Sequence, residues 1–495
     1  MSYIAGNGIT IQNDVISSKT TSINEIGSFK TDGSTIYIDN NNVIHGKKEQ
    51  KITLSDITLE INAETTTVTV TEHIGDGALS VSSSDTDVVT ASISDNTITV
   101  TGIDSGEATI TVTASATSTY QEATATIAVT VQAVDTRIFG VYWDGSSSPQ
   151  MTRTDDAVGF ADPNPYYAGM SGTPSSPFDD IMPWAGMVRS TDANAGELVA
   201  IPKFWYYLAK SGSSMTIKIS SAEQTGTGWQ ISPAHGDRGD GAGVRDVIYV
   251  GRYHCANGTY KSTTGVNPQV SKTRATFRSS IHNLGSNIWQ NDYATRITLW
   301  LLYVVEFANW NSQAKIGYGC GNNSSFQVMG YTDSMPYHTG TITSSRTTYG
   351  GTQYRYIEGL WDNVYDWCDG IVFSSFDVYV TRTPSNFGDT TSNHTYIGIR
   401  PTSSNEINAW NVYNNATEPW AIYPSSVTSD SNYATYVCDR CGYDSGGVVL
   451  CVGGSYGQSQ SYGFFYLNGV NDASFSSGYI GSRLMVLPPS RLTSQ

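Results

Sequence analysis

The feature that most constrains the fold of this chain is a strict alternation of hydroxyl and aliphatic side chains between residues 50 and 132. ATITVT at 108–113 places three apolar side chains on one face of a strand and threonines on the other, and 66–70 and 98–101 follow the same period. Turn-forming triplets interrupt the alternation at 75–77, 94–96 and 104–106. About seven short strands without a helical period predict an Ig-like β-sandwich over residues 50–132.

Residues 1–49 contain two shorter β-like phrases, ITIQNDVI at 9–16 and IYIDNNNVI at 36–44. Each phrase predicts a strand, a tight polar turn and a second strand. A segment of this size buries too little apolar surface to fold by itself. We therefore expect residues 1–49 to be a β-rich attachment or oligomerisation segment, which packs on copies of itself, as a homotrimer, or on another protein.

Residues 133–495 form a large aromatic zone that holds all 11 tryptophans of the chain. One strong helix is expected over 292–308, because apolar residues recur there in a stripe at helical spacing and Asn291 or Asp292 can cap the first turn. A shorter helix is expected over 276–283, and the rest consists of short strand patterns and loops rich in Gly, Ser and Asn. The predicted fold class is mainly β, with a C-terminal α+β domain that has few helices.

Charge and hydropathy exclude several classes of partner. The chain has 27 Lys and Arg against 44 Asp and Glu, a net charge of −17, and a surface of this sign repels nucleic acid and anionic lipid. The longest purely apolar run, from Leu299 to Val305, is far shorter than the roughly 20 residues of a membrane-spanning helix. Residues 1–15 contain no Lys or Arg, so we expect no signal peptide and synthesis in the cytoplasm.

A family resemblance supports the sandwich. SSDTDVV at 83–89, ITVTG at 98–102 and GEATITV at 106–112 resemble the bacterial Ig-like group 2 domain, although that family often has Trp where this chain has Val81. Such domains are mostly spacers or adhesion modules, and the segment offers no set of catalytic residues. The resemblance therefore implies a spacer role for residues 50–132.

The aromatic zone resembles the C-type-lectin-fold domains of phage tail proteins and of variable proteins. The motifs that carry this resemblance are IPKFWY at 201–206, RATFRS at 274–279, NWNSQ at 309–313, EGLWDNVYDWCDGI at 358–371, IGIRP at 397–401 and GSRL at 481–484. The resemblance implies one ligand-binding C-type-lectin-like domain over residues 133–495. The zone is also distantly similar to formylglycine-generating enzymes, but Cys320 and Cys368 lack the paired context of their active-site cysteines.

Two kinds of metal site can be weighed in this domain. The triplets that bind calcium in animal C-type lectins have only imperfect counterparts here, Glu-Pro-Trp at 418–420 and Trp-Asp-Asn at 361–363. Cys438 and Cys441 have the spacing of a zinc knuckle, and Cys451 is a candidate third ligand, but no fourth ligand is in view. The sequence therefore predicts neither a metal nor any other cofactor.

A hydrolytic site is the third chemical alternative. Carboxylates recur at steps of three or four residues at Glu358, Asp362, Asp366 and Asp369. Glycosidases use a pair of carboxylates to cleave a sugar chain, so a surface-polysaccharide depolymerase is conceivable. The four residues lie in an aromatic stretch that resembles the core of the fold, where we expect them to bond the backbone instead. The prediction is a protein that is not an enzyme.

In the segment 449–484, short motifs that look like a constant framework alternate with Tyr, Ser, Phe and Gly. It resembles the variable region of diversity-generating retroelement proteins, which are ligand-binding proteins of the same fold with rewritten positions. Tyr supplies rigid amphipathic contact area, and Ser and Gly adapt to a ligand. The alternative is that this segment is the Ser- and Tyr-rich edge of an ordinary lectin-like domain, without diversification. The ligand-binding positions that the resemblance implies are Tyr456, Gln458, Ser459, Ser461, Tyr462, Phe464, Asn471, Phe475, Ser477 and Tyr479.

Four aromatic residues of this segment, Tyr456, Tyr462, Phe475 and Tyr479, are expected to be partly exposed on one face. Together the patterns predict a phage virion protein, a head or tail fibre or a capsid decoration. Its N-terminal segment would contact other virion proteins, and its head would bind a bacterial surface glycan or protein. The expected location is the particle surface, after release by lysis. The alternatives are a depolymerase on the same architecture and a purely structural capsid fibre.

Overall fold

The computed structural model describes residues 3–5, 9–12, 15–18, 36–38, 44–56, 58–61, 65–131, 135–319, 321, 323–412, 418–429, 432–458 and 460–488. The chain divides into two units, 1–134 and 135–495, and each is described by itself. Strands dominate both units, and α-helices occur at only three places in the described residues, so the predicted mainly β class with few helices is confirmed. No helix in these ranges combines the length and the apolar character needed to cross a membrane.

The first 46 residues contribute five short strands to one sheet in the order β1-β2-β3-β5-β4. The strands are β1 (Tyr3–Ala5), β2 (Ile9–Gln12), β3 (Val15–Ser18), β4 (Ile36–Ile38) and β5 (Ile44–Gly46). β2 and β3 are antiparallel, with Ile11 opposite Ile16, and β4 and β5 are antiparallel, with Ile38 opposite Ile44. Both expected strand pairs are therefore present.

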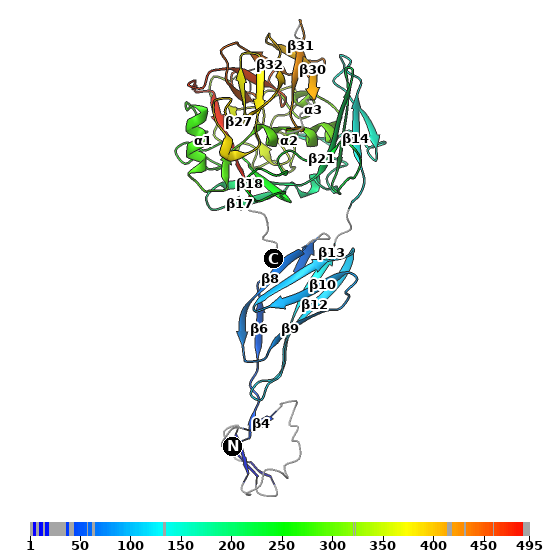
Figure 1. The fold of residues 1–495 in the computed structure, drawn as a ribbon, viewed down its shortest axis with the longest axis vertical. Helices are drawn as coiled ribbons and strands as arrows, with labels where there is room; N and C mark the ends of the chain where they lie inside the picture. The colour runs from blue at the N-terminus through cyan, green and yellow to red at the C-terminus, as the bar shows by residue number, and fades with distance from the viewer. Residues whose placement is uncertain are drawn as a thin grey trace. The chain divides into compact units, whose positions relative to one another are not determined.

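The rest of the first unit is a sandwich of two four-stranded sheets (Figure 1). One sheet has the order β10 (Val89–Ser94), β11 (Thr97–Gly102), β8 (Thr65–Ile74) and β6 (Lys51–Leu54). The other has the order β7 (Thr58–Ile61), β13 (Ala123–Val131), β12 (Gly106–Ala114) and β9 (Leu79–Ser83). Aliphatic side chains from both sheets, Ile110 among them, form one core, and the alternating threonines face outward. The predicted sandwich is confirmed.

The sandwich begins slightly before residue 50. Lys48 forms a bridge with Tyr120, and the amide of Gln50 donates hydrogen bonds to the carbonyls of Ser115 and Gln121 at 2.9 and 2.6 Å. These contacts join the start of the sandwich to the β12–β13 connection. A truncation that is meant to leave the sandwich intact should therefore end at residue 46.

The large unit contains four sheets within the described residues. The first has the order β15 (Thr152–Asp155), β14 (Phe139–Trp143), β20 (Ser214–Ser220), β19 (Trp205–Ser211) and β21 (Trp229–Ile231). The second has the order β16 (Tyr166–Tyr167), β24 (Gly340–Thr341), β25 (Thr352–Tyr354) and β26 (Ile357–Glu358). The third has the order β17 (Arg189–Asp192), β18 (Gly196–Pro202), β22 (Val247–Gly251), β36 (Leu484–Val486) and β23 (Ile288–Gln290).

The fourth and largest sheet has nine strands. Its order is β29 (Thr395–Ile399), β28 (Asp377–Val380), β27 (Tyr365–Ser374), β33 (Val449–Val452), β34 (Leu467–Asn471), β32 (Arg440–Tyr443), β30 (Asn405–Val412) and β31 (Ile422–Val427), and β35 (Ile480–Ser482) also pairs with β27. β27 is buried along its whole length except at Ser374. This buried strand provides a rigid support for whatever its two ends carry.

Helix α2 (Tyr293–Phe307) lies inside the large unit, surrounded by strands (Figure 1). Asp292 caps it by accepting a hydrogen bond from the Thr295 N–H at 2.9 Å, as predicted. The apolar stripe is buried as part of a helix that is buried on every side. The polar face is covered as well, since Arg296 donates to the carbonyls of Leu360 and Phe464 at 3.0 and 2.6 Å.

Two shorter helices complete the unit. α1 (Arg274–His282) begins two residues before the expected start, because Thr273 caps it through the Thr276 N–H. α3 (Ser312–Lys315) follows α2 and is capped by Asn311. A buried ion pair between Arg238 and Asp292, 2.5 Å long, fixes the start of α2 to the 232–238 loop. α2 is therefore fixed in the interior of the unit, whereas α1 and α3 are each only partly buried.

Candidate ligand-binding surface

Three loops meet at the N-terminal end of β27. The Tyr456 N–H donates to the carbonyl of Asn363 at 2.9 Å, and the Tyr365 N–H donates to the carbonyl of Tyr479 at 3.0 Å. Asn363 and Tyr365 are separated by one residue, so both parts of the predicted variable segment are tied to the same short stretch of backbone. The fold thus brings together Tyr456 and Tyr479, which are far apart within that segment.

Asn363 joins a further loop to this point. Its backbone is left-handed, with φ of +67°, a conformation that Asn tolerates better than most residues. Its side-chain amide accepts from the Gln327 N–H at 2.7 Å and donates to the Gln327 carbonyl at 3.1 Å. The Asn323 N–H donates to the Tyr456 carbonyl at 2.6 Å. The 323–327 loop and the 455–458 loop are therefore held together through one asparagine.

Aromatic rings gather on both sides of this junction. Tyr462 and Tyr479 lie against Tyr365, with ring centroids 6.3 and 6.0 Å away, and Tyr462 also packs on Tyr466 at 4.4 Å. Phe475 packs against the same apolar cluster. The segment 449–484 thus places two of its aromatic residues against one buried tyrosine and a third in the same cluster.

The second group of rings comes from loops that sequence reasoning did not assign to the site. Phe326 lies 6.2 Å from Tyr456, and Tyr318 lies 5.5 Å from Tyr349. Gly321 connects the two pairs: a methyl group on it would lie 3.1 Å from the Tyr349 ring and 2.1 Å from the Gln458 carbonyl. Aromatic residues among Gly, Asn and Ser at 317–326 were the available signal, the same signal that marks 449–484.

We call seven of these side chains the aromatic surface, and each is half-buried or exposed: Tyr318, Phe326, Tyr349, Tyr456, Tyr462, Phe475 and Tyr479. Tyr479 is the most open of the four that were expected to be partly exposed, at 39 %. Tyr456, Tyr462 and Phe475 are half-buried, so the expected partial exposure is confirmed, and their place on one face stays a prediction. Gln458 and Ser477 are half-buried as well, and Ser459 lies outside the described residues.

Three of the implied ligand-binding positions are corrected by the structure. Phe464 is 0 % exposed, Ser461 is 2 % and Asn471 is 8 %, so these side chains do not face a ligand. Phe464 packs on Trp361, and the Arg296 guanidinium lies 4.4 Å from its ring centre. The Asn471 amide contacts the Cys451 sulfur at 3.8 Å. The chain turns toward the core at 463–465, and the resemblance of 449–484 to a variable region does not predict this turn.

Asp439 holds this inward turn. Its two carboxylate oxygens accept from the backbone N–H groups of Gly463 and Phe465 at 2.6 and 2.7 Å. A side chain at Gly463 would strike the carboxylate, because a methyl group there would lie 2.6 Å from Asp439 Oδ1. Burial raises the pKa of Asp439 to about 7, although the two backbone N–H groups lower it. Asp439 thus fixes the base of the loop that carries Tyr462.

The zinc alternative finds no support in the geometry. Cys441 on β32 and Cys451 on β33 flank β34, so two strand spacings, about 10 Å, separate them, which is too far for shared coordination. Burial raises the pKa of the Cys438 thiol, and all three sulfurs are buried. Across the described part of the chain, no three His, Cys, Asp or Glu side chains come together in a way that could hold a metal ion.

The four carboxylates of the hydrolytic alternative are buried and occupied. Glu358 accepts from the N–H groups of Gly330 and Thr332 at 2.8 Å, and burial raises its pKa to about 7. Asp362 accepts from Thr352 and Tyr331. Asp366 lies 2.9 Å from His254 Nδ1 and forms an ion pair with Arg483, and Asp369 forms an ion pair with Arg278. Glu358 and Asp362 thus bond backbone N–H groups, as expected, whereas the main partners of Asp366 and Asp369 are side chains.

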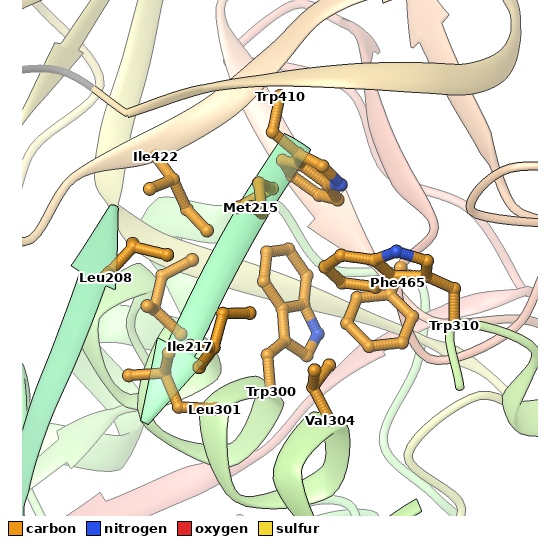
Figure 2. Close-up of a pocket in the computed structure, with 11 residues that line it drawn as sticks. Leu208, Met215, Ile217, Trp300, Leu301, Val304, Trp310, Trp410, Ile422 and Phe465 are labelled. Carbon is orange, nitrogen blue, oxygen red and sulfur yellow. The ribbon is translucent and has the colours of Figure 1, made fainter. Parts of the chain in front are cut away.

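A small void lies deep in the large unit. Figure 2 shows Trp300, Trp310, Trp410 and Phe465 around it, together with aliphatic side chains that include Met215. Its volume is about 10 Å³, and its lining is wholly apolar. Such a space holds one water molecule at most. The void is a packing defect of the core and not a ligand site.

No protein-family model matches the chain, and no curated protein matches it either. The residues themselves and the aromatic surface are therefore the basis for assigning a function.

Proposed function

We propose that this chain is a phage virion protein whose large unit, a C-type-lectin-like head, binds a ligand on the bacterial surface through the aromatic surface. The observation that carries the proposal is the convergence of partly exposed rings from three loops on the buried end of β27. Partly exposed aromatic residues in a rigid setting are the residue type that most often anchors a ligand. The sandwich serves as a spacer, and residues 1–46 attach the protein to the particle as a homotrimer or on other virion proteins.

Rigidity is the second support for this proposal. Asn363 and Asp439 each fix a loop of the aromatic surface by two hydrogen bonds, and Tyr365 stands on a buried strand. Rings that are already ordered lose little conformational entropy when a ligand binds. The aromatic surface can tolerate sequence variation, because its exposed side chains can change while these hydrogen bonds to the loop backbone remain. The proposed diversification of Tyr456, Tyr462, Phe475 and Tyr479 rests on this argument.

Neither enzymatic alternative receives a specific observation in its favour. The carboxylates of 358–369 are buried and saturated by internal partners, and no pair of them faces the aromatic surface from a solvent-filled cleft. Binding without catalysis is therefore the function that the geometry supports best.

The test is attachment of the purified full-length protein to cells of the bacterium that releases the particles. We expect saturable attachment of the wild-type protein, and a loss with Tyr479→Ala. The matched control is Tyr396→Ala on β29, since Tyr396 is 48 % exposed and lies near Tyr379, which pairs with Val372 about 20 Å along β27 from Tyr365. Equal attachment of all three proteins would contradict the proposal. Antibody detection of the protein on purified particles tests its location.

A further inference from the structure

The aromatic surface is nearly free of charge, although the chain as a whole is strongly acidic. Asp472 is the only charged residue in the segments 317–330 and 453–481, and it is engaged with the N–H and hydroxyl of Ser474 at 2.7 and 2.6 Å. The segment 341–350, which carries Tyr349, contributes Arg346, whose guanidinium donates to the Asn164 side chain and the Pro165 carbonyl. The guanidinium also lies over the Tyr167 ring, 5.5 Å from its centre, so uncharged groups of the same unit occupy part of its donor set.

Two cations adjoin this surface. Lys272 follows Ser271, whose N–H donates to the Ser477 carbonyl at 3.0 Å, and the Arg440 N–H donates to the Ser461 carbonyl at 3.1 Å. Cations at the edge of an interface are screened by water and salt and contribute little to affinity. The rings themselves are interspersed with hydroxyl and amide groups, Gln458 and Ser477 among them.

We infer that the ligand of the aromatic surface is a neutral glycan, an inference that rests on the proposed ligand-binding function. A sugar ring has an apolar face that covers an aromatic ring, and its hydroxyls both donate and accept hydrogen bonds. Ser hydroxyls and Gln or Asn amides likewise both donate and accept, so the two sets of groups match. Neither partner brings a charge that would lose its hydration on contact.

The same feature argues against a protein ligand. A typical protein epitope has about 20 to 30 residues, and about a quarter of an ordinary protein's residues are charged. Several charges would then be pressed against an uncharged surface, where their lost hydration is not compensated. An anionic polymer is disfavoured for a related reason, because the segments 317–330 and 453–481 contain no Lys or Arg to bind phosphate or carboxylate.

The test uses the full-length protein and cells of the bacterium that releases the particles. Cells are treated either with periodate, which cleaves the vicinal diols of sugars, or with a broad-specificity protease. We expect periodate to abolish attachment and the protease to leave it intact. Polysaccharide extracted from the same cells is passed over an anion exchanger. The neutral flow-through should compete for attachment, and the retained acidic fraction should not.

Salt and variants complete the design. Raising the salt from about 0.05 to about 0.5 M should change the apparent Kd less than about twofold, since no ion pair is formed. Tyr479→Ala should weaken competition by the neutral fraction about 30-fold, and Tyr396→Ala should not change it. Protease-sensitive attachment, or competition by the acidic fraction with strong salt dependence, would overturn the neutral glycan and leave ligand binding standing. Attachment that Tyr479→Ala does not weaken would instead remove the proposed function.

Discussion

Truncation of two tyrosines, Tyr479 and Tyr462, separates ligand binding from folding within the aromatic surface. Tyr479 has one described ring contact, with Tyr365 at 6.0 Å, and it is 39 % exposed. Tyr462 is half-buried and has two, with Tyr365 at 6.3 Å and Tyr466 at 4.4 Å. The sequence alone predicts that neither substitution by Ala changes the melting temperature. The contacts revise this expectation for Tyr462.

The magnitudes follow from these contacts. An aromatic pair contributes about 0.5–1.5 kcal/mol beyond its buried area, so Tyr462→Ala should lower the free energy of unfolding of the head by about 1–3 kcal/mol. Tyr479→Ala should lower it by about 1 kcal/mol or less, because its single contact is partly open to water. In binding, the loss of one anchoring residue costs about 2 kcal/mol, which corresponds to an affinity about 30-fold weaker.

The assay pairs urea unfolding of each full-length variant, followed by tryptophan fluorescence, with attachment to cells of the host bacterium. All tryptophans lie beyond residue 133, so the fluorescence reports the head alone. We expect Tyr479→Ala to lose attachment with nearly unchanged unfolding, and Tyr462→Ala to lose both. The reasoning fails if Tyr479→Ala strongly destabilises the head while attachment per folded molecule is intact, because Tyr479 would then be a core residue.

Four further perturbations test other parts of the molecule. Ile110→Asp places an unpaired charge in the sandwich core and should lower the free energy of unfolding of the sandwich by more than about 4 kcal/mol. A protease should then cleave the spacer, while the head still attaches to cells. Deletion of 1–46 should leave a folded, soluble protein that no longer enters particles; normal incorporation would contradict the attachment role. Glu358 and Asp439 have pKa values raised to about 7, so the folded state binds their protons more tightly than the unfolded state. The stability that these protonated groups confer is lost as the pH rises through 7, so the free energy of unfolding measured with urea should be lower at pH 8 than at pH 6. It should fall by at most about 1.4 kcal/mol per pH unit for each group, and Glu358→Gln should reduce this fall. Asn363→Ala should speed hydrogen exchange at 323–327 and weaken attachment, and unchanged exchange would refute its role as a clamp.

The sequence by itself determined the elements whose signal is local. The sandwich follows from alternation over 50–132, because a period of two places every second side chain on one face. The helix at 292–308 and its Asp292 cap follow from helical spacing and from one side chain that reaches a nearby N–H. The partial exposure of Tyr456 and Tyr479 could also be predicted, since aromatic residues flanked by Gly and Ser have few neighbours to bury them.

Only the tertiary structure decided which residues share the aromatic surface. Phe326 and Tyr349 join it because Asn363 bonds Gln327 and because Gly321 permits close approach. Phe464 leaves it because the Ser312 hydroxyl, distant in the sequence, and Asp439 bind the backbone around it and draw it onto α2. Such hydrogen bonds join positions 24 to 152 residues apart, so a local sequence pattern cannot predict them. Whether a side chain faces a ligand or the core therefore depends on bonding partners far away in the sequence, which the spacing of residues along the chain does not identify.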